Sequence, residues 1–387
     1  MQMGQNSGVI RRTMACAVMM VSIGSLQAAP YVLTAVIQTN TALPGGAVPA
    51  TVGTAGLSNS GRVVAVGQSA TGSAVFTQFG QVVGRGAVID GLEVDNFFSA
   101  NINNLDQVAF VGQQGTTWRV LTPDGTLVPA GQAVGSSNVS YYIDLPVAWS
   151  DGGKASAYAV LANATAALVS SDGTAIKNGD IVGGVAMTAI GQGSLSPNGQ
   201  LAFIGGFGGS NGIFRDGSLV AGPGYTVGGR TITNYDFRPA VNDAGTVAFT
   251  GLFAGGVGVY TQSRIVAETG STVDGIPLLA AGAYWVDINS HGQVAYRGDY
   301  AGGGAIFVDD VLVADRGFFV DGIEIYDIPE APFLNDAGQV AFTAILMDGN
   351  TAVVLATPSA AVPEPQSGVL ALIGLAFVAA GKFRRGR

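Results

Sequence analysis

The hydrophobic and polar positions of this chain follow one nine-residue pattern, in which a polar turn leads into a run of alternating large and small residues. The clearest copy is Leu-Asn-Asp-Ala-Gly-Gln-Val-Ala-Phe at 334–342, and close copies begin at Val241, Ile288 and Leu195. Three weaker copies precede them. The turn position recurs every 45 to 47 residues, at Gly61, Asp106, Gly153, Gly199, Gly245, Gly292 and Gly338. A fixed period of this length predicts a repeat architecture.

The chemistry of each copy predicts a turn followed by a strand. Asn and Asp hydrogen-bond to their own backbone, and Gly adopts a positive φ without steric cost. We therefore expect a positive φ at Gly245 and Gly338. In the last copy, Val340 and Phe342 alternate with small residues, which is the period of a strand.

One whole repeat, residues 236–284, predicts four short strands followed by a longer loop at Thr269–Gly282. Four strands in about 45 residues are typical of a propeller blade. Seven such repeats predict an all-β, seven-bladed β-propeller over residues 30–358. The four strands expected in this repeat are Asp236–Val241, Thr246–Gly251, Gly258–Gln262 and Arg264–Glu268.

The last repeat lacks a fourth strand, because the chain reaches Thr357-Pro358 directly after the third, at Ala352–Ala356. Near the start of the chain, Tyr31–Ile37 has no preceding partners and resembles the fourth strands of other repeats, such as Val311–Asp315. We expect this N-terminal strand to complete the last blade and close the ring, which would remove exposed strand edges.

Residues 1–29 have the pattern of a secretory signal peptide. Arg11 and Arg12 precede an apolar run at Met14–Leu26, and Ala28-Ala29 offers small residues for cleavage. The only cysteine, Cys16, lies inside this segment. The mature chain is therefore expected to contain neither a disulfide nor a reactive thiol.

The C-terminal residues 359–387 have the pattern of a second targeting signal. A Pro-Glu-Pro motif is followed by an apolar run at Val369–Ala380 and a basic end; the motif residues are Val362, Pro363, Glu364, Pro365, Lys382, Arg384, Arg385 and Arg387. This order resembles the PEP-CTERM sorting signal of Gram-negative bacteria. The resemblance implies transient insertion of a short transmembrane helix, recognition by an exosortase-type enzyme, and routing to the outer surface or the extracellular polysaccharide matrix. On physical grounds alone, the segment is a short membrane helix with basic residues on the cytoplasmic side, and a plain tail anchor is the alternative.

The charge of the body excludes some partners. The full chain has a net charge of −9, and removing both terminal segments leaves 11 basic and 25 acidic residues. So acidic a body argues against nucleic-acid binding and against electrostatic adhesion to anionic lipid.

No catalytic, cofactor-binding or metal-binding residue is predicted. The only histidine, His291, falls in the turn position that Ala244 and Ala337 fill in other repeats, and we interpret it as an exposed turn residue. The sequence contains no HExxH zinc motif, no phosphate-binding P-loop and no nucleophile elbow.

Carboxylates and aromatic residues recur near the first strand of several repeats, and we consider them a possible ligand face. Such a set can hold a cation or stack on sugar rings. The structural alternative is that each carboxylate accepts backbone N–H groups while the aromatic rings pack between blades. The residues are Asp95, Asp144, Asp236, Asp287, Asp327, Tyr142, Tyr235, Trp285 and Tyr326.

Three functions remain open at this point. The first is a non-catalytic surface or matrix protein that binds a ligand, with extracellular polysaccharide as a candidate. The second is an extracellular glycan hydrolase or lyase, which would need a pair of carboxylates in one blade. The third is a structural matrix component without a specific ligand, and fold alone does not choose among the three.

Overall fold

The computed structural model describes residues 30–143, 147–282 and 284–359. The predicted signal peptide and all but the first residue of the predicted sorting segment lie outside the described residues. Across the part that is described, every regular element is a β-strand, and no helix is long and apolar enough to cross a membrane.

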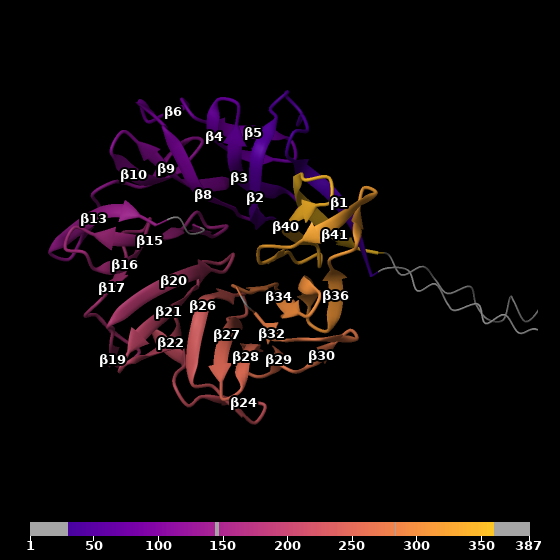
Figure 1. Cartoon of the computed structure of the whole chain (residues 1–387). Coiled ribbons are helices and arrows are strands. Elements are labelled where there is room, and N and C mark those ends of the chain that lie inside the picture. Colours follow the sequence, from indigo (N-terminus) through magenta and orange to yellow (C-terminus); the bar gives the residue numbers. More distant parts are fainter. Residues whose placement is uncertain (1–29, 144–146, 283, 360–387) are drawn as a thin grey trace, which may run out of the picture.

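Seven antiparallel sheets of four to six strands each are arranged in a ring, so the prediction of a seven-bladed propeller is confirmed (Figure 1). Blade 1 contains β2 (Pro49–Leu57), β3 (Val63–Ser69), β4 (Gly72–Thr77) and β5 (Gly80–Gly84). Blade 2 contains β8 (Asn96–Ile102), β9 (Val108–Gln114), β10 (Thr117–Thr122) and β11 (Gly125–Val128). Blade 3 contains β13 (Ser137–Tyr142), β14 (Ala148–Trp149), β15 (Ala155–Leu161), β16 (Ala166–Ser170) and β17 (Ala175–Lys177).

Blades 4 to 7 continue the same order. Blade 4 contains β20 (Ala189–Leu195), β21 (Leu201–Phe207), β22 (Ser210–Arg215) and β23 (Ser218–Ala221), and blade 5 contains β26 (Asn234–Val241), β27 (Val247–Phe253), β28 (Gly256–Thr261) and β29 (Ile265–Glu268). Blade 6 contains β32 (Ala280–Ala281), β33 (Asp287–Ile288), β34 (Val294–Tyr300), β35 (Gly303–Val308) and β36 (Val311–Ala314). Blade 7 contains β38 (Ile323–Asp327), β39 (Phe333–Leu334), β40 (Val340–Leu346), β41 (Thr351–Pro358) and β1 (Tyr31–Gln38).

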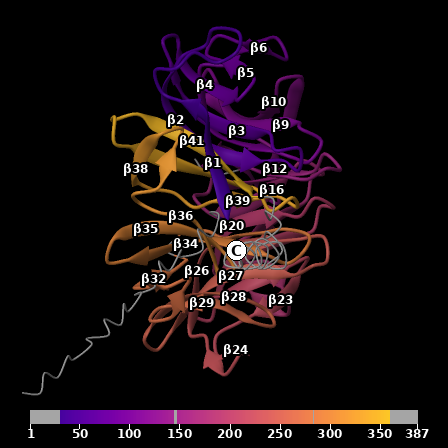
Figure 2. The same cartoon turned by 90° about the vertical axis from the view of Figure 1, so that its right-hand side faces the viewer.

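The last blade is closed by the N-terminal strand, as predicted. β1 pairs antiparallel with β41, from Tyr31 opposite Pro358 to Gln38 opposite Ala352. The two strands lie side by side in both views of the molecule (Figures 1 and 2). This closure joins segments more than 300 residues apart in the sequence and gives the last blade its outer strand.

The alternation of large and small residues along each second strand lets neighbouring blades pack closely. In β40, Val340 and Phe342 are buried together with Ile306 of blade 6. Ala341 points to the opposite side of the sheet and is buried with Phe76 of blade 1. The large side chains of β40 therefore face blade 6, and its small side chain Ala341 faces blade 1. Closely stacked sheets fill the space between them in this way.

The connections between blades contain hairpins where the sequence predicted a longer loop, and these hairpins cover the fourth strands. An aspartate in the turn of a hairpin makes this contact. The carboxylate of Asp274 accepts the N–H of Leu312 in β36 at 3.0 Å. Asp90 caps Thr126 in β11 at 2.8 Å, and Asp321 caps Ala35 in the closing strand at 3.0 Å. The hairpin strands are β6 (Val88–Ile89), β7 (Leu92–Glu93), β12 (Ala133–Val134), β18 (Ile181–Val182), β19 (Val185–Ala186), β24 (Thr226–Val227), β25 (Arg230–Thr231), β30 (Thr272–Val273), β31 (Ile276–Pro277) and β37 (Phe319–Val320).

Deleting residues 30–38 should strongly destabilise the body, because β41 would keep β40 on one side but lose its outer partner, β1, along almost its whole length. We expect the melting temperature to fall by roughly 10 °C or more, or the protein to aggregate, since a domain's net stability is small. Thermal melting followed by circular dichroism measures this. A chain that ends at Ser359 is the control and should melt like the full-length protein, whereas an unchanged melting temperature for the deletion would contradict closure by β1.

Candidate functional site

The seven turns share one hydrogen-bonding pattern. The first polar residue of each turn accepts the backbone N–H four residues later through its side chain, as Asn335 does from Gln339 at 2.9 Å and Ser58 from Arg62 at 3.2 Å. All seven turn positions have a positive φ, including Asp106 at 62°. The expectation for Gly245 and Gly338 is thus confirmed, with φ of 76° and 73°.

These turns also hydrogen-bond from blade to blade around one end of the central channel, here called the turn face. Asn242 donates its side-chain N–H to the carbonyl of Asn289 at 2.9 Å, and Asn289 donates to Asn335 at 3.1 Å. Asn335 in turn donates to Ser58 at 3.0 Å, which links the last blade to the first. All of these side chains are buried, so the bonds are shielded from water.

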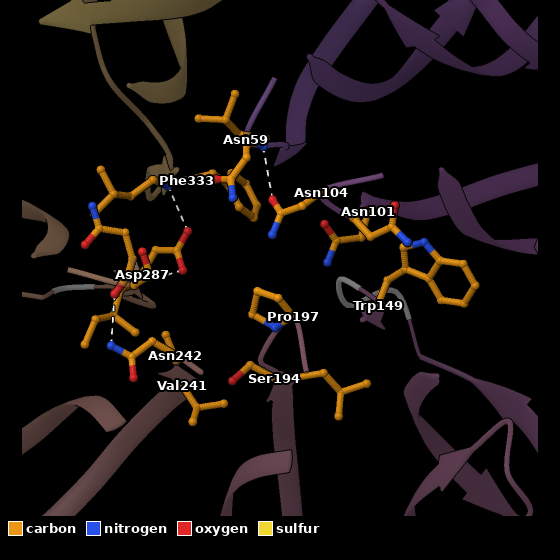
Figure 3. A pocket seen from close by; sticks show the side chains of 18 of the residues that line it. Asn59, Asn101, Asn104, Trp149, Ser194, Pro197, Val241, Asn242, Asp287 and Phe333 are labelled. Atoms are coloured by element: carbon orange, nitrogen blue, oxygen red, sulfur yellow. Dashed lines mark hydrogen bonds between the residues drawn. The ribbon is translucent and has the colours of Figure 1, made fainter. Parts of the chain in front are cut away.

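The inner residues of the turns and the ends of the innermost strands line a cavity of about 120 Å³, here called the axial cavity. Figure 3 shows Asn59, Asn101, Asn104, Ser194 and Asp287 around it. Most of its polar groups are amides and carboxylates that come from different blades. The cavity is therefore built by the ring as a whole.

Three buried polar atoms of the axial cavity have no hydrogen-bond partner among the described residues: Nε1 of Trp149, Oγ of Ser194 and Nε of Arg238. Buried polar groups normally have partners, and each exception calls for an explanation. Two of the three, the indole and guanidinium N–H groups, can only donate. All three atoms are inaccessible to water, so a ligand would reach them only if the side chains around them moved.

Arg238 reaches the axial cavity because its strand is irregular. The pairing of β26 with β27 is interrupted between Asp236 and Ala240, and Phe237 has a φ of 59°, which is unusual for a bulky residue. The Arg238 side chain is only 6% exposed, and its guanidinium lies 5.7 Å from the centre of the Trp285 ring.

Asp287 is a titratable group of the axial cavity that this setting affects. Its carboxylate accepts the N–H of Leu334 at 2.8 Å and that of Ile288 at 2.9 Å. Burial raises the pKa of Asp287 to about 6, although these two N–H groups and the nearby Arg238 act in the opposite direction. Burial likewise lowers the pKa of Arg238. Asp287 therefore changes charge in the mildly acidic range.

The structure brings two of the nine sequence-predicted ligand-face residues to this region, since Asp287 lines the axial cavity and Trp285 lies against Arg238. The other described carboxylates accept backbone N–H groups instead: Asp95 from Gly115 at 2.7 Å, Asp236 from Phe237 at 2.9 Å and Asp327 from Ile328 at 2.9 Å.

The aromatic members of that set lie apart. Tyr142 and Tyr235 are buried in separate cores and donate their hydroxyl groups to the carbonyls of Pro129 and Gly222, and Tyr326 is exposed beneath Arg316. Asp144 lies outside the described residues. The nine therefore do not form one set.

Sequence reasoning missed Asn101, Trp149, Ser194 and Arg238. For Asn101 and Ser194 the sequence does contain a signal. Both occupy the position two residues before the first polar residue of their turn, and this position lies at the wall of the channel. Unlike the turn itself, this position varies from repeat to repeat. Its occupants are Gly56, Asn101, Ala148, Ser194, Ala240, Asp287 and Phe333.

A second hollow of about 550 Å³ lies next to the axial cavity, between blades 1 and 2, and is here called the blade groove. Its wall includes Phe79, which is 61% exposed, and Arg62, whose guanidinium lies 5.1 Å from the centre of that ring. Leu127 and Asp106 also line it. Trp149 is the one residue that lines both hollows.

The described residues contain no group of three or more His, Cys, Asp or Glu side chains that could hold a metal ion. The acidic side chains at the rim of the axial cavity are used otherwise. The carboxylate of Asp151 accepts the N–H of Asn104 at 2.8 Å, and that of Asp243 accepts the N–H of Asn198 at the same distance.

Replacing Gly338 tests the backbone requirement of the turns. Gly338→Val should lower the free energy of unfolding by more than about 1 kcal/mol, because a β-branched residue is strained at positive φ. Gly338→Asn is the matched control and should cost less than about 0.5 kcal/mol, because Asn tolerates this conformation. Denaturant unfolding measures both, and equal costs would contradict the assignment.

Asp287 should give stability a specific pH dependence. Its folded-state pKa of about 6 lies above the ordinary 3.8, so the folded state binds more protons than the unfolded state between these values. The free energy of unfolding should therefore fall by roughly 1–3 kcal/mol as the pH rises from about 4 to about 6. Asp287→Asn should remove this decline and Asp236→Asn, at an exposed carboxylate, should keep it. A decline of the same size in Asp287→Asn would contradict the assignment.

Comparisons with known proteins leave the family open. No family model matches the sequence, and no curated protein matches it. Similar solved structures include BBS1N in complex with ARL6DN, soaked with lead, at a TM-score of 0.41 and 12% identity over 86% of this chain and 98% of that one. YCF48 from Cyanidioschyzon merolae has a TM-score of 0.36 and 14% identity over 79% and 95%. The gluconolactonase XC5397 from Xanthomonas campestris has a TM-score of 0.33 and 8% identity over 85% and 90%. At these values the likeness says nothing about function.

Proposed function

We propose that this chain is an exported surface or matrix protein of a Gram-negative bacterium, sorted by an exosortase-type enzyme, whose propeller binds extracellular polysaccharide without transforming it. The observation that carries the binding role is the axial cavity, which is lined by polar side chains from several blades. The order of Pro-Glu-Pro, apolar run and basic end supports the proposed export and sorting.

Carbohydrate suits the chemistry of the turn face. Sugar hydroxyls both accept from and donate to amide side chains such as those of Asn59, Asn101 and Asn104, which line the axial cavity. Aromatic side chains such as Phe79 offer a flat apolar surface with room for a ring. A pocket with a few convergent polar groups is the usual form of a small-ligand site.

The same face carries the ends of the propeller chain. Tyr31 pairs with Pro358, and Pro358 lies close to the turn at Gly338, so β41 ends on the turn face. Ten residues separate Pro358 from the apolar run that begins at Val369, a reach of at most about 35 Å. A chain still tethered by its tail would hold the turn face toward the membrane, and processing would free it for ligand.

The alternative is an extracellular glycan hydrolase or lyase on this fold, and one observation favours it. Asp287 lines the axial cavity with a pKa raised to about 6, which suits a general acid. Glycoside hydrolysis would need a second carboxylate placed opposite the first. Release of reducing ends from matrix polysaccharide by the wild-type protein, lost in Asp287→Asn, would establish this alternative.

Processing of the tail is tested in cells with and without an exosortase. With the enzyme, the mature protein should lose everything after roughly Pro365, and without it the chain should remain membrane-bound and full length. Mass spectrometry of the released protein measures this. Released material that still carries Arg384 and Arg385 in the strain with the enzyme would leave only a plain tail anchor.

The axial cavity is tested by removing one of its unpartnered groups. Ser194→Val should weaken binding of the purified body, residues 30–359, to matrix polysaccharide about fivefold, which corresponds to a hydrogen bond worth about 1 kcal/mol. Ser156→Val is the matched control, because Ser156 Oγ is also buried and unpartnered but does not line the cavity. Co-sedimentation measures the affinity, and equal effects of the two changes on binding would contradict the cavity as the site.

A further inference from the structure

We infer that the blade groove is a carbohydrate site in its own right, which binds the rings of an uncharged polysaccharide from the side. The inference rests on the proposed function, because it takes polysaccharide as the ligand. It adds the class of glycan and a place of contact that is separate from the axial cavity. It follows from a comparison of the groove with other gaps between blades and from the exposed groups in its wall.

The gap between blades 1 and 2 lacks a bridge that two other gaps on the turn face contain. Arg215 of blade 4 donates a hydrogen bond to the carbonyl of Gly245 in blade 5, and Arg264 of blade 5 donates to that of Gly292 in blade 6 at 3.0 Å. The guanidinium of Arg62 in blade 1 forms no hydrogen bond with any described residue, and its ion pair across the gap spans 3.8 Å. A hollow of about 550 Å³ remains in this gap, within the usual range for a ligand site.

The apolar wall of this hollow also departs from the repeat. Phe79 occupies the tip between the third and fourth strands of blade 1 and is 61% exposed. Val82, Pro123 and Leu127 line the same hollow, so Phe79 is part of a larger apolar surface, and such surfaces mark binding sites. The corresponding tips of blades 2 to 6 carry no aromatic residue; they are Pro-Asp at 123–124, Ser-Asp at 171–172, Asp-Gly at 216–217, Gln-Ser at 262–263 and Asp-Asp at 309–310.

Two exposed polar side chains stand beside this apolar surface and have unused hydrogen-bonding groups. The side-chain N–H groups of Gln107 donate to no described residue, and the carboxylate of Asp124 accepts from none. The wall therefore offers a donor and an acceptor that a ligand can reach without rearrangement. A sugar ring matches this arrangement, because its C–H face packs on an aromatic ring while its hydroxyl groups both donate and accept.

The charged side chains of the groove select an uncharged glycan. The guanidinium of Arg62 lies 5.1 Å from the centre of the Phe79 ring, and Asp106 and Asp124 line the same hollow. A polyuronate would meet the two carboxylates, and a glycan of free amino sugars would meet the guanidinium beside the aromatic ring. Like charges at an interface disfavour a partner, so the groove favours neither class of charged glycan.

The exposed surface recognises a ring and not a chain end. It consists of one aromatic side chain with polar groups at its edge, and every ring along a polysaccharide presents the same kind of face to it. A proline-rich peptide is the alternative occupant, but such peptides dock in grooves lined by aromatic rings. The other aromatic residue of the blade groove, Trp149, is only 7% exposed, so the groove offers a single ring.

Isothermal titration of residues 30–359 with hexamers of β-linked glucose, galacturonate and glucosamine tests the inference. We expect the glucose hexamer to bind about tenfold more tightly than either charged hexamer, because only the charged ones meet a like charge. Cyclic β-glucan, which has no chain end, should bind within about threefold of the linear hexamer. A proline-rich peptide should not displace the glucose hexamer.

Phe79→Ala should lower the affinity for the glucose hexamer about fivefold, because the stacking surface is lost. Phe319→Ala is the matched control, because Phe319 is 62% exposed and lies in an outer hairpin. Tighter binding of a charged hexamer, much weaker binding of the cyclic glucan, displacement by the peptide, or equal effects of the two changes would overturn this inference while leaving carbohydrate binding intact. No binding of the glucose hexamer would also overturn it, and no binding of matrix polysaccharide either would overturn the proposed function as well.

Discussion

The structure depends on the buried hydrogen bonds that run from turn to turn around one end of the channel. Each turn is first made rigid by its own Asn or Ser side chain, which accepts the N–H four residues later. The free amide hydrogens of Asn242, Asn289 and Asn335 then reach the next blade. Each of these three side chains therefore fixes the geometry of its own turn and also holds the next blade at a set distance. The shape of the axial cavity at the centre of the ring depends on the turn geometry and on the spacing of the blades.

Ring closure joins this network to the ends of the chain. The Asn335 bond to Ser58 connects blade 7 with blade 1, and the pairing of β1 with β41 holds the N-terminal strand within blade 7. Asp321 adds a third link by capping the closing strand at Ala35. The described body, residues 30–359, therefore begins and ends at one edge of the turn face, which connects the architecture with the proposed release of the body from its tail.

What repeats in this protein could be predicted from its sequence, and what varies could not. The period and the turn residues predicted seven blades and a closing strand, because turn chemistry and strand alternation are local and are present seven times. Asn101, Ser194 and Asp287 share one position before the turn, but they have no common chemistry and so gave no repeated signal. Arg238 lies on an irregular stretch of β26, where the period of two no longer says which way a side chain points.

The central claim is that the turn face is the ligand-binding face, and hydrogen–deuterium exchange of residues 30–359 tests it most directly. The measurement compares the protein alone with the protein in the presence of polysaccharide from cells that have an exosortase. The account predicts slower exchange in the turns at 58–62 and 103–107 and in the hairpin at 77–80, with no change in the outer hairpins such as β30–β31. Protection confined to the outer hairpins, or no protection when the polysaccharide is in excess, would contradict it.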